Sequence, residues 1–460
     1  MADYDVLILG SGPGGYVAAI RAGQLGMRAA VVESRELGGI CLNWGCIPSK
    51  ALLKNAEVLD TFRHAKEYGI SFDNLQFDFG HAVDRSRTVV KRLTNGIGYL
   101  FEKNNVTVVK GTGVFETPTT VSVAEADQTL TADNVIIATG ASQRDLPNLR
   151  IDHDVVITSR DALLMREVPR RVVIVGGGAT GAEFAYIYRA YGAEVTVVEL
   201  LPRIVPQEDE EVSEQLERAF RRQRIKVLAG ASVTSVDVAD GTATVGITSG
   251  LQASSIECDR VLVAVGVKGN TTGIGLERIG VETTNSFVAV DERMRTNVPG
   301  VYAIGDVTGK MLLAHVASAQ GVTAVEHIAD LSPPELDYPT MPRAIYCKPQ
   351  VASFGLTEEQ AREQGHSVKV GKFPLSASGK AMAMGETLGL VKLVVDTETG
   401  EVLGAHMIGP EVTELLGQAS LVNLLEGTTE ELGWLVHPHP TISETLKEAA
   451  LAAEGAAVHV

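Results

Sequence analysis

The chain has 460 residues, of which 45% are hydrophobic and 21% charged, and its formal net charge at pH 7 is −17. This length exceeds a single ordinary hydrophobic core and predicts about three domains of a globular protein. The acidic excess argues against nucleic acid as a ligand, because its phosphates need a basic surface. The excess is compatible with a basic protein partner and with a role in solubility alone. No apolar run approaches the ~20 residues that cross a membrane.

The N-terminal segment predicts a strand, a glycine loop, a helix and a second strand. In chain order these are residues 5–9, the loop Gly10-x-Gly12-x-x-Gly15, residues 16–25 and residues 28–33. The first glycine permits a tight turn, the second lets the backbone approach a pyrophosphate, and the third lets the helix pack against the strand. The helix N-terminus attracts phosphates, and Glu33 would accept hydrogen bonds from a ribose 2′-hydroxyl. This start has no basic segment and no cleavage pattern, so we expect no secretory signal and a cytoplasmic location.

Two cysteines follow this unit, Cys41 and Cys46, with four residues between them. Four cysteines in a chain of this length do not make a disulfide scaffold, so the close pair is interpreted as redox-active or metal-binding. A static disulfide and half of a zinc site are the alternatives, although a second ligand pair at finger-like spacing is missing. Pro48 fits the first turn of a helix that continues through residues 51–54. That helix would place Cys46 at its N-terminus, where a thiolate is stabilised.

A second strand, glycine loop, helix and strand repeat the first pattern. They are residues 171–175, the loop Gly176-x-Gly178-x-x-Gly181, residues 182–191 and residues 194–199. Each unit ends in a glutamate 18 residues past its last glycine, Glu33 in the first and Glu199 in the second. Two such units predict two bound dinucleotides, or one duplicated domain with an inactive site. Because a carboxylate repels a 2′-phosphate, the terminal glutamate of each unit disfavours a dinucleotide that carries one.

The remaining segments divide the chain further. Residues 134–140 and 259–266 are apolar strands that end in turns, and we interpret both as crossing points between domains. From about residue 337 the pattern changes to short strands followed by helices, which predicts a third, α+β domain. Cys258 and Cys347 stand alone and are interpreted as inert buried thiols. The Ala-rich residues 449–460 are expected to fray at their end.

A histidine near the C-terminus is the candidate base. A histidine side chain in general titrates near neutrality, so His439 could take a proton from a dithiol, although His437 competes for this role and a purely structural histidine is the alternative. Glu444 could orient the imidazole of His439. The segment Thr441-Ile-Ser-Glu444 is also a capping box that could begin the final helix, and the two roles of Glu444 could partly coexist.

These residues resemble the flavin-dependent pyridine-nucleotide disulfide oxidoreductases over nearly the whole chain. The resemblance rests on six motifs: Gly10-x-Gly12-x-x-Gly15, the block 38–50 around Cys41 and Cys46, Ala138-Thr-Gly140, Gly176-x-Gly178-x-x-Gly181-Ala-Glu183, Tyr302-Ala-Ile-Gly-Asp306 and His439-Pro-Thr-Ile-Ser-Glu444. The cysteine and C-terminal histidine blocks are the most specific. The chain departs from the common pattern at Ile40, at Trp44 and at residues 267–270, and the last change bears on how the loop that closes the nicotinamide domain is held.

The resemblance implies an α/β fold of two Rossmann-like dinucleotide-binding domains and a C-terminal α+β dimerisation domain. Residues 1–147 would bind FAD, 148–270 would bind NAD, 271–336 would return to the FAD domain, and 337–460 would form the homodimer interface. Asp306 would hydrogen-bond the ribitol chain of the flavin. The cofactor-binding residues are expected to be Gly10, Gly12, Gly15, Glu33, Lys50, Thr139, Gly140, Gly176, Gly178, Gly181, Glu183, Glu199, Gly266, Asp306 and Ala314, and no metal site is expected.

The resemblance also implies the reaction and its residues. Cys46 would face the flavin and Cys41 would meet the substrate, while His439 and Glu444 of one subunit would serve the disulfide of the other. Lys50 would pair with Glu183 beside the flavin; a solvated lysine and an exposed acid near its helix N-terminus are the alternatives.

The motifs look most like the branch of the family that oxidises protein-bound dihydrolipoyl groups with NAD. The expected partners are therefore a second copy of the chain and, in a 2-oxo acid dehydrogenase complex, the lipoyl domain and the E3-binding segment. A reductase for another disulfide, such as glutathione, and a non-catalytic binding subunit with the same fold are the alternatives.

Overall fold

The computed structural model describes residues 2–144 and 146–459. The chain forms two compact units, each assembled from segments that are distant in the sequence. We call them the first unit, Met1–Ala51 with His81–Asp145 and Val265–Leu336, and the second unit, Leu52–Gly80 with Leu146–Ala264 and Asp337–Val460. None of the helices in the described part of the chain is both long and apolar enough to cross a membrane.

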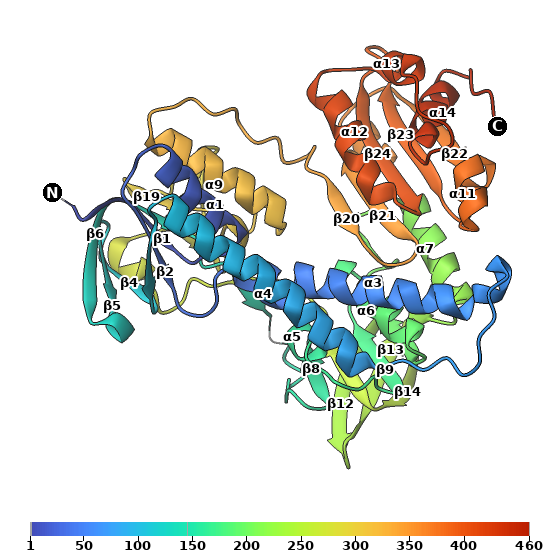
Figure 1. The fold of residues 1–460 in the computed structure, drawn as a ribbon, viewed down its shortest axis with the longest axis horizontal. Helices are drawn as coiled ribbons and strands as arrows, with labels where there is room; N and C mark the ends of the chain where they lie inside the picture. Colours follow the sequence, from blue (N-terminus) through green and yellow to red (C-terminus); the bar gives the residue numbers. More distant parts are fainter. Residues whose placement is uncertain (1, 145, 460) are drawn as a thin grey trace. The chain divides into compact units, whose positions relative to one another are not determined.

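A seven-stranded sheet is the centre of the first unit (Figure 1). Its strands run in the order β3 (Thr107–Lys110), β2 (Ala29–Glu33), β1 (Tyr4–Leu9), β6 (Gln128–Ile137), β5 (Thr120–Val123) and β4 (Gly113–Thr117), and β19 (Val301–Ala303) also pairs with β6. The pairs among β3, β2, β1, β6 and β19 are parallel, and β5 and β4 add an antiparallel meander. The central strands β1, β2 and β19 are apolar on both faces because both faces are covered, whereas the edge strand β3 is mostly exposed.

Successive residues of β1 point to opposite faces of this sheet. Val6 and Ile8 pack in a core with residues of α1 (Pro13–Gln24) and α9 (Ala314–Ile328), two helices that lie side by side in Figure 1. Leu7 and Leu9 pack in the other core with Phe115 of the meander. The carboxyl end of β1 is thereby fixed between two cores, and the first glycine loop begins there.

The nucleotide-binding helices begin three residues earlier than the sequence predicted. α1 begins at Pro13 rather than at residue 16, and α6 (Ala179–Ala190) begins at Ala179 rather than at residue 182. Proline is well suited to the first helical position because its φ is preset and its missing N–H would be unpaired there. The last glycine of each loop therefore lies inside the first turn of its helix.

The second unit contains a five-stranded parallel sheet that repeats this architecture. Its order is β11 (Lys226–Leu228), β10 (Glu194–Val198), β9 (Arg171–Val175), β15 (Arg260–Val263) and β8 (Val156–Thr158). A three-stranded antiparallel sheet follows in the chain, formed by β12 (Ala231–Ala239), β13 (Thr242–Ser249) and β14 (Gln252–Cys258). Asp209 caps the N-terminus of α7 (Glu210–Arg222), which precedes β11.

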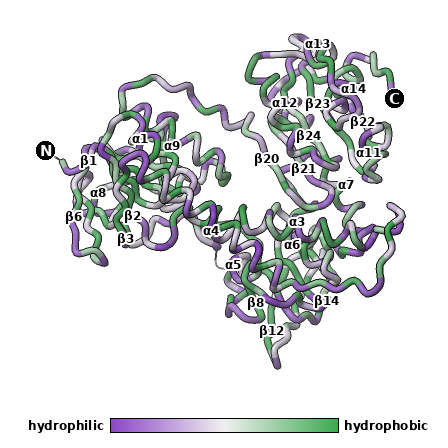
Figure 2. Tube along the Cα trace, in the orientation of Figure 1, coloured by the Kyte–Doolittle hydropathy of each residue, from purple (hydrophilic) through white to green (hydrophobic). Residues whose placement is uncertain are grey.

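The C-terminal part of the second unit is a five-stranded antiparallel sheet with helices packed against it. The strand order is β20 (Arg343–Ile345), β21 (Gln350–Gly355), β24 (Val402–Gly409), β23 (Leu390–Asp396) and β22 (Val368–Pro374), and the helices include α10 (Glu358–Glu363), α11 (Gly379–Met384), α12 (Val412–Leu424), α13 (Thr429–Trp434) and α14 (Glu444–Ala453). Figure 2 shows hydrophobic colouring along the inner strands of this sheet, whose residues form one apolar core with α12 and α14.

The C-terminal tail is held to α14, so the expectation of a frayed end is wrong for the described residues. The backbone N–H groups of Val458 and His459 donate to Oε2 of Glu448 at 3.2 and 3.3 Å, and Nδ1 of His459 lies 2.8 Å from Oε1. The buried carboxylate of Glu448 thus satisfies the tail, a contact that an Ala-rich composition does not reveal. Residue 460 lies outside the described residues.

Candidate active site

The first glycine loop has the geometry that a dinucleotide requires. Gly10 has φ 107°, and a Cβ on Gly15 would lie 2.0 Å from the carbonyl oxygen of Gly10, so neither position tolerates a side chain. A Cβ on Gly12 would have no neighbour within 4 Å, which leaves the space beside its backbone open. Glu33 accepts hydrogen bonds from the N–H and the hydroxyl of Ser11 at 2.8 and 2.6 Å. The glutamate expected to bind ribose therefore also fixes the loop.

The second glycine loop repeats this geometry. Gly176 has φ 106°, a Cβ on Gly181 would lie 1.9 Å from the carbonyl oxygen of Gly176, and a Cβ on Gly178 would have open space. Glu199 accepts a hydrogen bond from the N–H of Gly177 at 2.6 Å. The two loops are thus built in the same way, and the second has no feature that would exclude a nucleotide.

Asp306 lies in a short 3-10 helix, η3 (Gly305–Thr308), in the first unit. Burial raises the pKa of its carboxyl group to about 6. Among the described residues, none donates a hydrogen bond to this carboxylate. A partly buried carboxylate without donors is an acceptor that a hydroxyl-bearing ligand, such as the ribitol chain of FAD, can satisfy.

The altered loop at residues 267–270 is well held in the first unit. β16 (Val267–Gly269) pairs with β7 (Ala141–Gln143), and the side-chain amide of Asn270 donates to the carbonyl of Thr139 at 2.9 Å. The hydroxyl of Thr139 in turn donates to the carbonyl of Asn270 at 2.8 Å, and the N–H of Asn270 donates to Gly140. The departure from the family pattern therefore leaves this loop attached to the Thr139–Gly140 turn.

Two further expected cofactor-binding residues are also in the first unit. Gly266 follows β15 and accepts a hydrogen bond at its carbonyl from the N–H of Arg144. Ala314 is the first residue of α9, so its N–H is among the backbone donors that a helix N-terminus leaves available. Their contacts with a cofactor stay predictions.

The cysteine pair lies on two consecutive helices. Cys41 is in α2 (Gly39–Trp44), Gly45 separates the helices, and Cys46 is the first residue of α3 (Cys46–Arg63), as the sequence predicted. Both residues are thiols in this structure, and a hydrogen bond to Cys46, followed by burial, raises the pKa of Cys41, while the charge of Lys50 opposes the increase. Because Cys46 is the first residue of α3, the helix N-terminus favours a thiolate at this position.

Two residues that the sequence did not single out lie next to this pair. Tyr16 of α1 is half-buried, and burial, Cys41 and Cys46 together raise the pKa of its phenol. Arg87 of α4 (Phe79–Lys103) contacts the segment between the cysteines. Tyr16 directly follows the glycine motif, and this position is the only sequence signal that could have indicated its role. No sequence signal indicated Arg87.

His439 and Glu444 meet in the second unit. Nδ1 of His439 lies 2.9 Å from Oε1 of Glu444, and the imidazole is 78% exposed. The N–H of Thr441 donates to Oε2 of the same carboxylate at 2.8 Å. Burial opposes ionisation of Glu444, but the hydrogen bonds from Thr441 and His439 outweigh it and lower the pKa of this carboxyl. Glu444 thus contacts His439 as expected, but the capping box does not form: α14 begins at Glu444 itself, with Ser443 as its N-cap and no side-chain cap hydrogen bond.

The competing histidine is already engaged. Nε2 of His437 lies 2.8 Å from the amide nitrogen of Gln418, and Nδ1 lies 3.1 Å from the carbonyl oxygen of Leu435. Burial lowers the pKa of His437. By contrast, no residue in the described part of the chain hydrogen-bonds Nε2 of His439. His439 therefore has a nitrogen available for proton transfer.

Glu183 is buried in α6, with an exposed fraction of 5%, and its Oε1 accepts a hydrogen bond from the N–H of Tyr346 at 3.1 Å. The alternative of an exposed acid near the helix N-terminus is therefore wrong. Lys50 belongs to the first unit and lies near enough to Cys41 for its charge to act on that thiol. The pairing of Lys50 with Glu183 stays a prediction.

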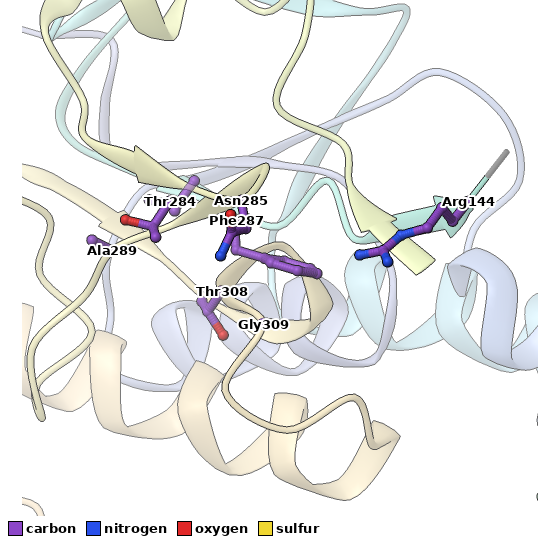
Figure 3. Close-up of a pocket in the computed structure, with 8 residues that line it drawn as sticks. Arg144, Thr284, Asn285, Phe287, Ala289, Thr308 and Gly309 are labelled. Atoms are coloured by element: carbon purple, nitrogen blue, oxygen red, sulfur yellow. The ribbon is translucent and has the colours of Figure 1, made fainter. Parts of the chain in front are cut away.

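A pocket of about 540 Å³ opens in the first unit (Figure 3). The guanidinium of Arg144 and the ring of Phe287 extend toward one another in it, and Thr308 and Gly309 lie beside them. None of the residues that line it was expected in the active site. The pocket is therefore not assigned to the reaction.

The comparisons with known proteins identify the family. Residues 4–321 match the family described as pyridine nucleotide-disulphide oxidoreductase, and residues 341–450 match the dimerisation domain of these proteins. The chain belongs to the pyridine nucleotide-disulphide oxidoreductases, which confirms the predicted α/β fold with its C-terminal dimerisation domain.

The comparison with individual proteins gives a more specific result than the family match. The chain is 49% identical over 457 residues to the dihydrolipoyl dehydrogenase of Mycobacterium leprae, with 97% of each chain covered, and 44% identical over 470 residues to that of Bacillus subtilis, with 99% of each covered. Its fold is similar to the solved structure of LpdA from Mycobacterium tuberculosis, with a TM-score of 0.90, 28% identity and coverage of 97% of this chain and 98% of that one. The flavoprotein disulfide reductase RclA from Escherichia coli is similar at a TM-score of 0.86, with 26% identity and coverage of 96% and 98%.

The protein is thus an oxidoreductase that uses FAD and NAD. The residues present fit both groups: the open space at Gly12 and Gly178 admits two pyrophosphates, and none of the residues that the structure describes donates to the carboxylate of Asp306. The fit does not depend on a metal, and among the described residues no group of three or more His, Cys, Asp or Glu side chains is placed to hold one.

Proposed function

We propose that this protein oxidises protein-bound dihydrolipoyl groups to lipoyl groups and reduces NAD, with Cys41 and Cys46 as the redox pair. The observation that carries the proposal is the contact between the two thiols at the N-terminus of α3, in a chain that is 44–49% identical to dihydrolipoyl dehydrogenases. Bound FAD would take the electron pair from the cysteines and pass it to NAD as a hydride.

The exchange of sulfur bonds uses the chain's own groups. A thiolate of the dihydrolipoyl group attacks Sγ of Cys41 in the disulfide, the Cys41–Cys46 bond breaks, and Cys46 leaves as a thiolate. The second substrate thiolate then attacks the substrate sulfur of this mixed disulfide, which closes the lipoyl ring and releases Cys41. The N-terminus of α3 favours Cys46 as the leaving thiolate.

His439 would accept the substrate protons. Its Nδ1 is held by Glu444, and its Nε2 is available at the surface. The ionised carboxylate stabilises the imidazolium that forms when the base is protonated. His439 lies in the dimerisation domain, so the family's homodimer offers a way to bring it to the cysteines of the other subunit. The shared active site is part of the proposal.

The substrate is the point at which members of this fold differ. RclA, a flavoprotein disulfide reductase, has nearly the same backbone, so the fold alone does not select a substrate. Sequence identity over the whole chain is much higher with the dihydrolipoyl dehydrogenases. We therefore propose a lipoyl domain as the substrate protein and an E3-binding segment of a 2-oxo acid dehydrogenase complex as a further partner, with the cytoplasm as the location.

A cysteine variant tests the redox pair. Cys46→Ser should abolish the oxidation of dihydrolipoamide by NAD and leave FAD bound, because it removes the sulfur that must leave as a thiolate while keeping the helix N-terminus. Turnover is followed by NADH absorbance and cofactor content by the flavin spectrum. The unmodified enzyme is assayed in parallel with NADPH and glutathione disulfide. If the unmodified enzyme turns over only NADPH and glutathione disulfide, the proposed substrate is wrong. If the Cys46→Ser variant retains turnover of dihydrolipoamide, the proposed mechanism is wrong.

A pair of histidine variants tests the base. His439→Gln should lower lipoamide turnover by about 10²–10⁴-fold, the usual contribution of a positioned acid–base group. His437→Gln is the matched control, because it removes the neighbouring imidazole that is already bonded to Gln418 and Leu435. The control should retain at least one-tenth of the activity. Equal losses in the two variants would remove His439 from its role.

A further inference from the structure

Trp44 belongs to the segment that separates the two cysteines, and its indole contacts both a cation and an anion. Its ring centroid is 4.4 Å from Cζ of Arg87, which is within the range of a cation–π contact. Its Nε1 lies 3.3 Å from Oε2 of Glu36. All three residues belong to the first unit. Trp44 is also one of the positions at which the chain departs from the common family pattern.

Arg87 also holds the backbone of the same segment. Its Nη1 donates to the carbonyl of Asn43 at 2.5 Å, which satisfies one of the carbonyls left unpaired at the end of α2. The side-chain amide of Asn43 donates to the carbonyls of Leu37 and Gly39, both at 2.9 Å. The short helix that carries Cys41 is therefore fixed at both of its ends, and at its C-terminal end Arg87 contributes both contacts.

We propose that the Trp44–Arg87 stack is a positioning device that keeps Cys41 and Cys46 close enough to re-form their disulfide quickly and completely. The inference rests on the proposed redox role of the two cysteines, and it assigns a role to two residues outside that pair. The stack acts on the backbone between the sulfurs and touches no substrate.

The physical reason lies in the ring-closing step. When a monothiol such as glutathione attacks Sγ of Cys41, the bond to Cys46 breaks and a mixed disulfide forms. The Cys46 thiolate can then attack Cys41 and expel the glutathione thiolate, which restores the disulfide. This second step is intramolecular, so its equilibrium depends on the effective concentration of Cys46 at Cys41. Fixing the segment between the two residues raises that concentration.

Trp44→Leu and Arg87→Gln in the FAD-bound dimer test the stack. We expect each variant to lower the equilibrium constant for disulfide formation by three- to tenfold in dithiothreitol redox buffers, where tenfold corresponds to about 30 mV. In glutathione buffers the fraction of protein with glutathione on Cys41 should rise by a similar factor, as read by peptide mass spectrometry. Cys258 and Cys347 are 0% and 1% exposed and should not react.

Three further variants separate this role from loss of charge or fold. Arg85→Gln removes an equal charge from the same helix, where Arg85 contacts the carbonyl of Ala51 at 3.3 Å, and it should leave the equilibrium constant unchanged. Trp44→Phe and Arg87→Lys retain a ring or a cation and should give intermediate values. Retained FAD in every variant shows that the fold is intact.

The outcomes distinguish the two proposals. If the unmodified pair forms a disulfide and the Trp44 and Arg87 variants have the same equilibrium constant and adduct fraction, the stack has no positioning role. An Arg85→Gln variant that matches Arg87→Gln would also overturn it, because charge alone would then explain the effect. If the unmodified Cys41 and Cys46 form no disulfide at all, the proposed function itself fails.

Discussion

Asp306 is partly buried, and none of the described residues donates a hydrogen bond to its carboxylate. The free energy required to ionise this carboxyl group should therefore appear in the pH dependence of the protein's stability. Burial raises its pKa from 3.8 to about 6, so between these pH values the folded chain binds more protons than the unfolded chain. The stability of the cofactor-free protein should therefore fall as the pH rises through this window and stay constant above it. This pH dependence is expected of a residue whose carboxylate binds a ligand and does not stabilise the folded chain.

Asp306→Asn should stabilise the cofactor-free protein at pH 7 and weaken FAD binding. The amide is isosteric and uncharged, so the variant should gain up to about 3 kcal/mol at pH 7, the equivalent of a shift of about two pKa units, and nothing below about pH 4. Thermal unfolding at the two pH values measures the gain, and FAD release by dilution measures the affinity. A variant that is less stable at pH 7, or that keeps FAD as tightly, would contradict this role of Asp306.

Individual site residues were predictable where the signal is local and not where it depends on distant contacts. Glu33, Glu199 and the cysteines follow from spacing along one segment. The partner of His437 could not be predicted, because Gln418 belongs to a different helix, and the catalytic role of His439 stays a prediction.

At the scale of elements, the glycine loops are the best test of the dinucleotide sites. An added side chain would have a different effect at each glycine of a loop. A Cβ at Gly181 would collide with the carbonyl oxygen of Gly176, which prevents α6 from packing on β9. A Cβ at Gly178 would meet nothing in the protein, and only a ligand that approaches its backbone would be displaced. The two positions therefore separate folding from binding.

Gly178→Ala should raise the Kd for NADH by about tenfold or more and leave the melting temperature within about 2 °C, whereas Gly181→Ala should lower the melting temperature by several degrees, since overpacking costs about 1–3 kcal/mol or more. Isothermal titration and calorimetry measure the two effects. Gly178→Ala with unchanged NADH affinity would show that no pyrophosphate approaches this loop.

The elements themselves were largely visible in the sequence, and the misplacements have physical causes. The strands predicted at residues 5–9 and 171–175 are apolar runs, and they match β1 and β9 to within one residue. The starts of α1 and α6 were placed three residues late, because glycine has low helix propensity in general but is required in the first turn here. The tail after α14 was misjudged because its contacts with Glu448 lie outside any local pattern.

At the scale of the whole molecule, a cluster of charged residues joins the two sheet-containing parts of the second unit. Lys392 of β23 is 3% exposed, and its Nζ lies 3.0 Å from Asp209, the N-cap of α7, 2.8 Å from Glu211 and 3.2 Å from Glu358. Burial disfavours the charge of Lys392, but hydrogen bonds to Glu211 and Asp209 outweigh it and raise the pKa of the amine. The nucleotide-binding sheet and the dimerisation domain are thus connected through a buried cation.

Removing this cation should destabilise the second unit strongly, because it leaves the buried carboxylate of Asp209 without its counter-ion. Lys392→Met should cost about 3–5 kcal/mol, measured by calorimetry of the FAD-bound protein. Lys372→Met is the matched control: Lys372 also pairs with Glu211, at 2.6 Å, but its side chain is 46% exposed, so its loss should cost about 1 kcal/mol or less and should diminish in salt. Adding Asp209→Asn to Lys392→Met should recover part of the loss, because Asn keeps the helix cap while the orphaned charge disappears. If Lys392→Met is no more harmful than Lys372→Met, the buried cation does not hold the two parts together, and their connection depends on apolar packing.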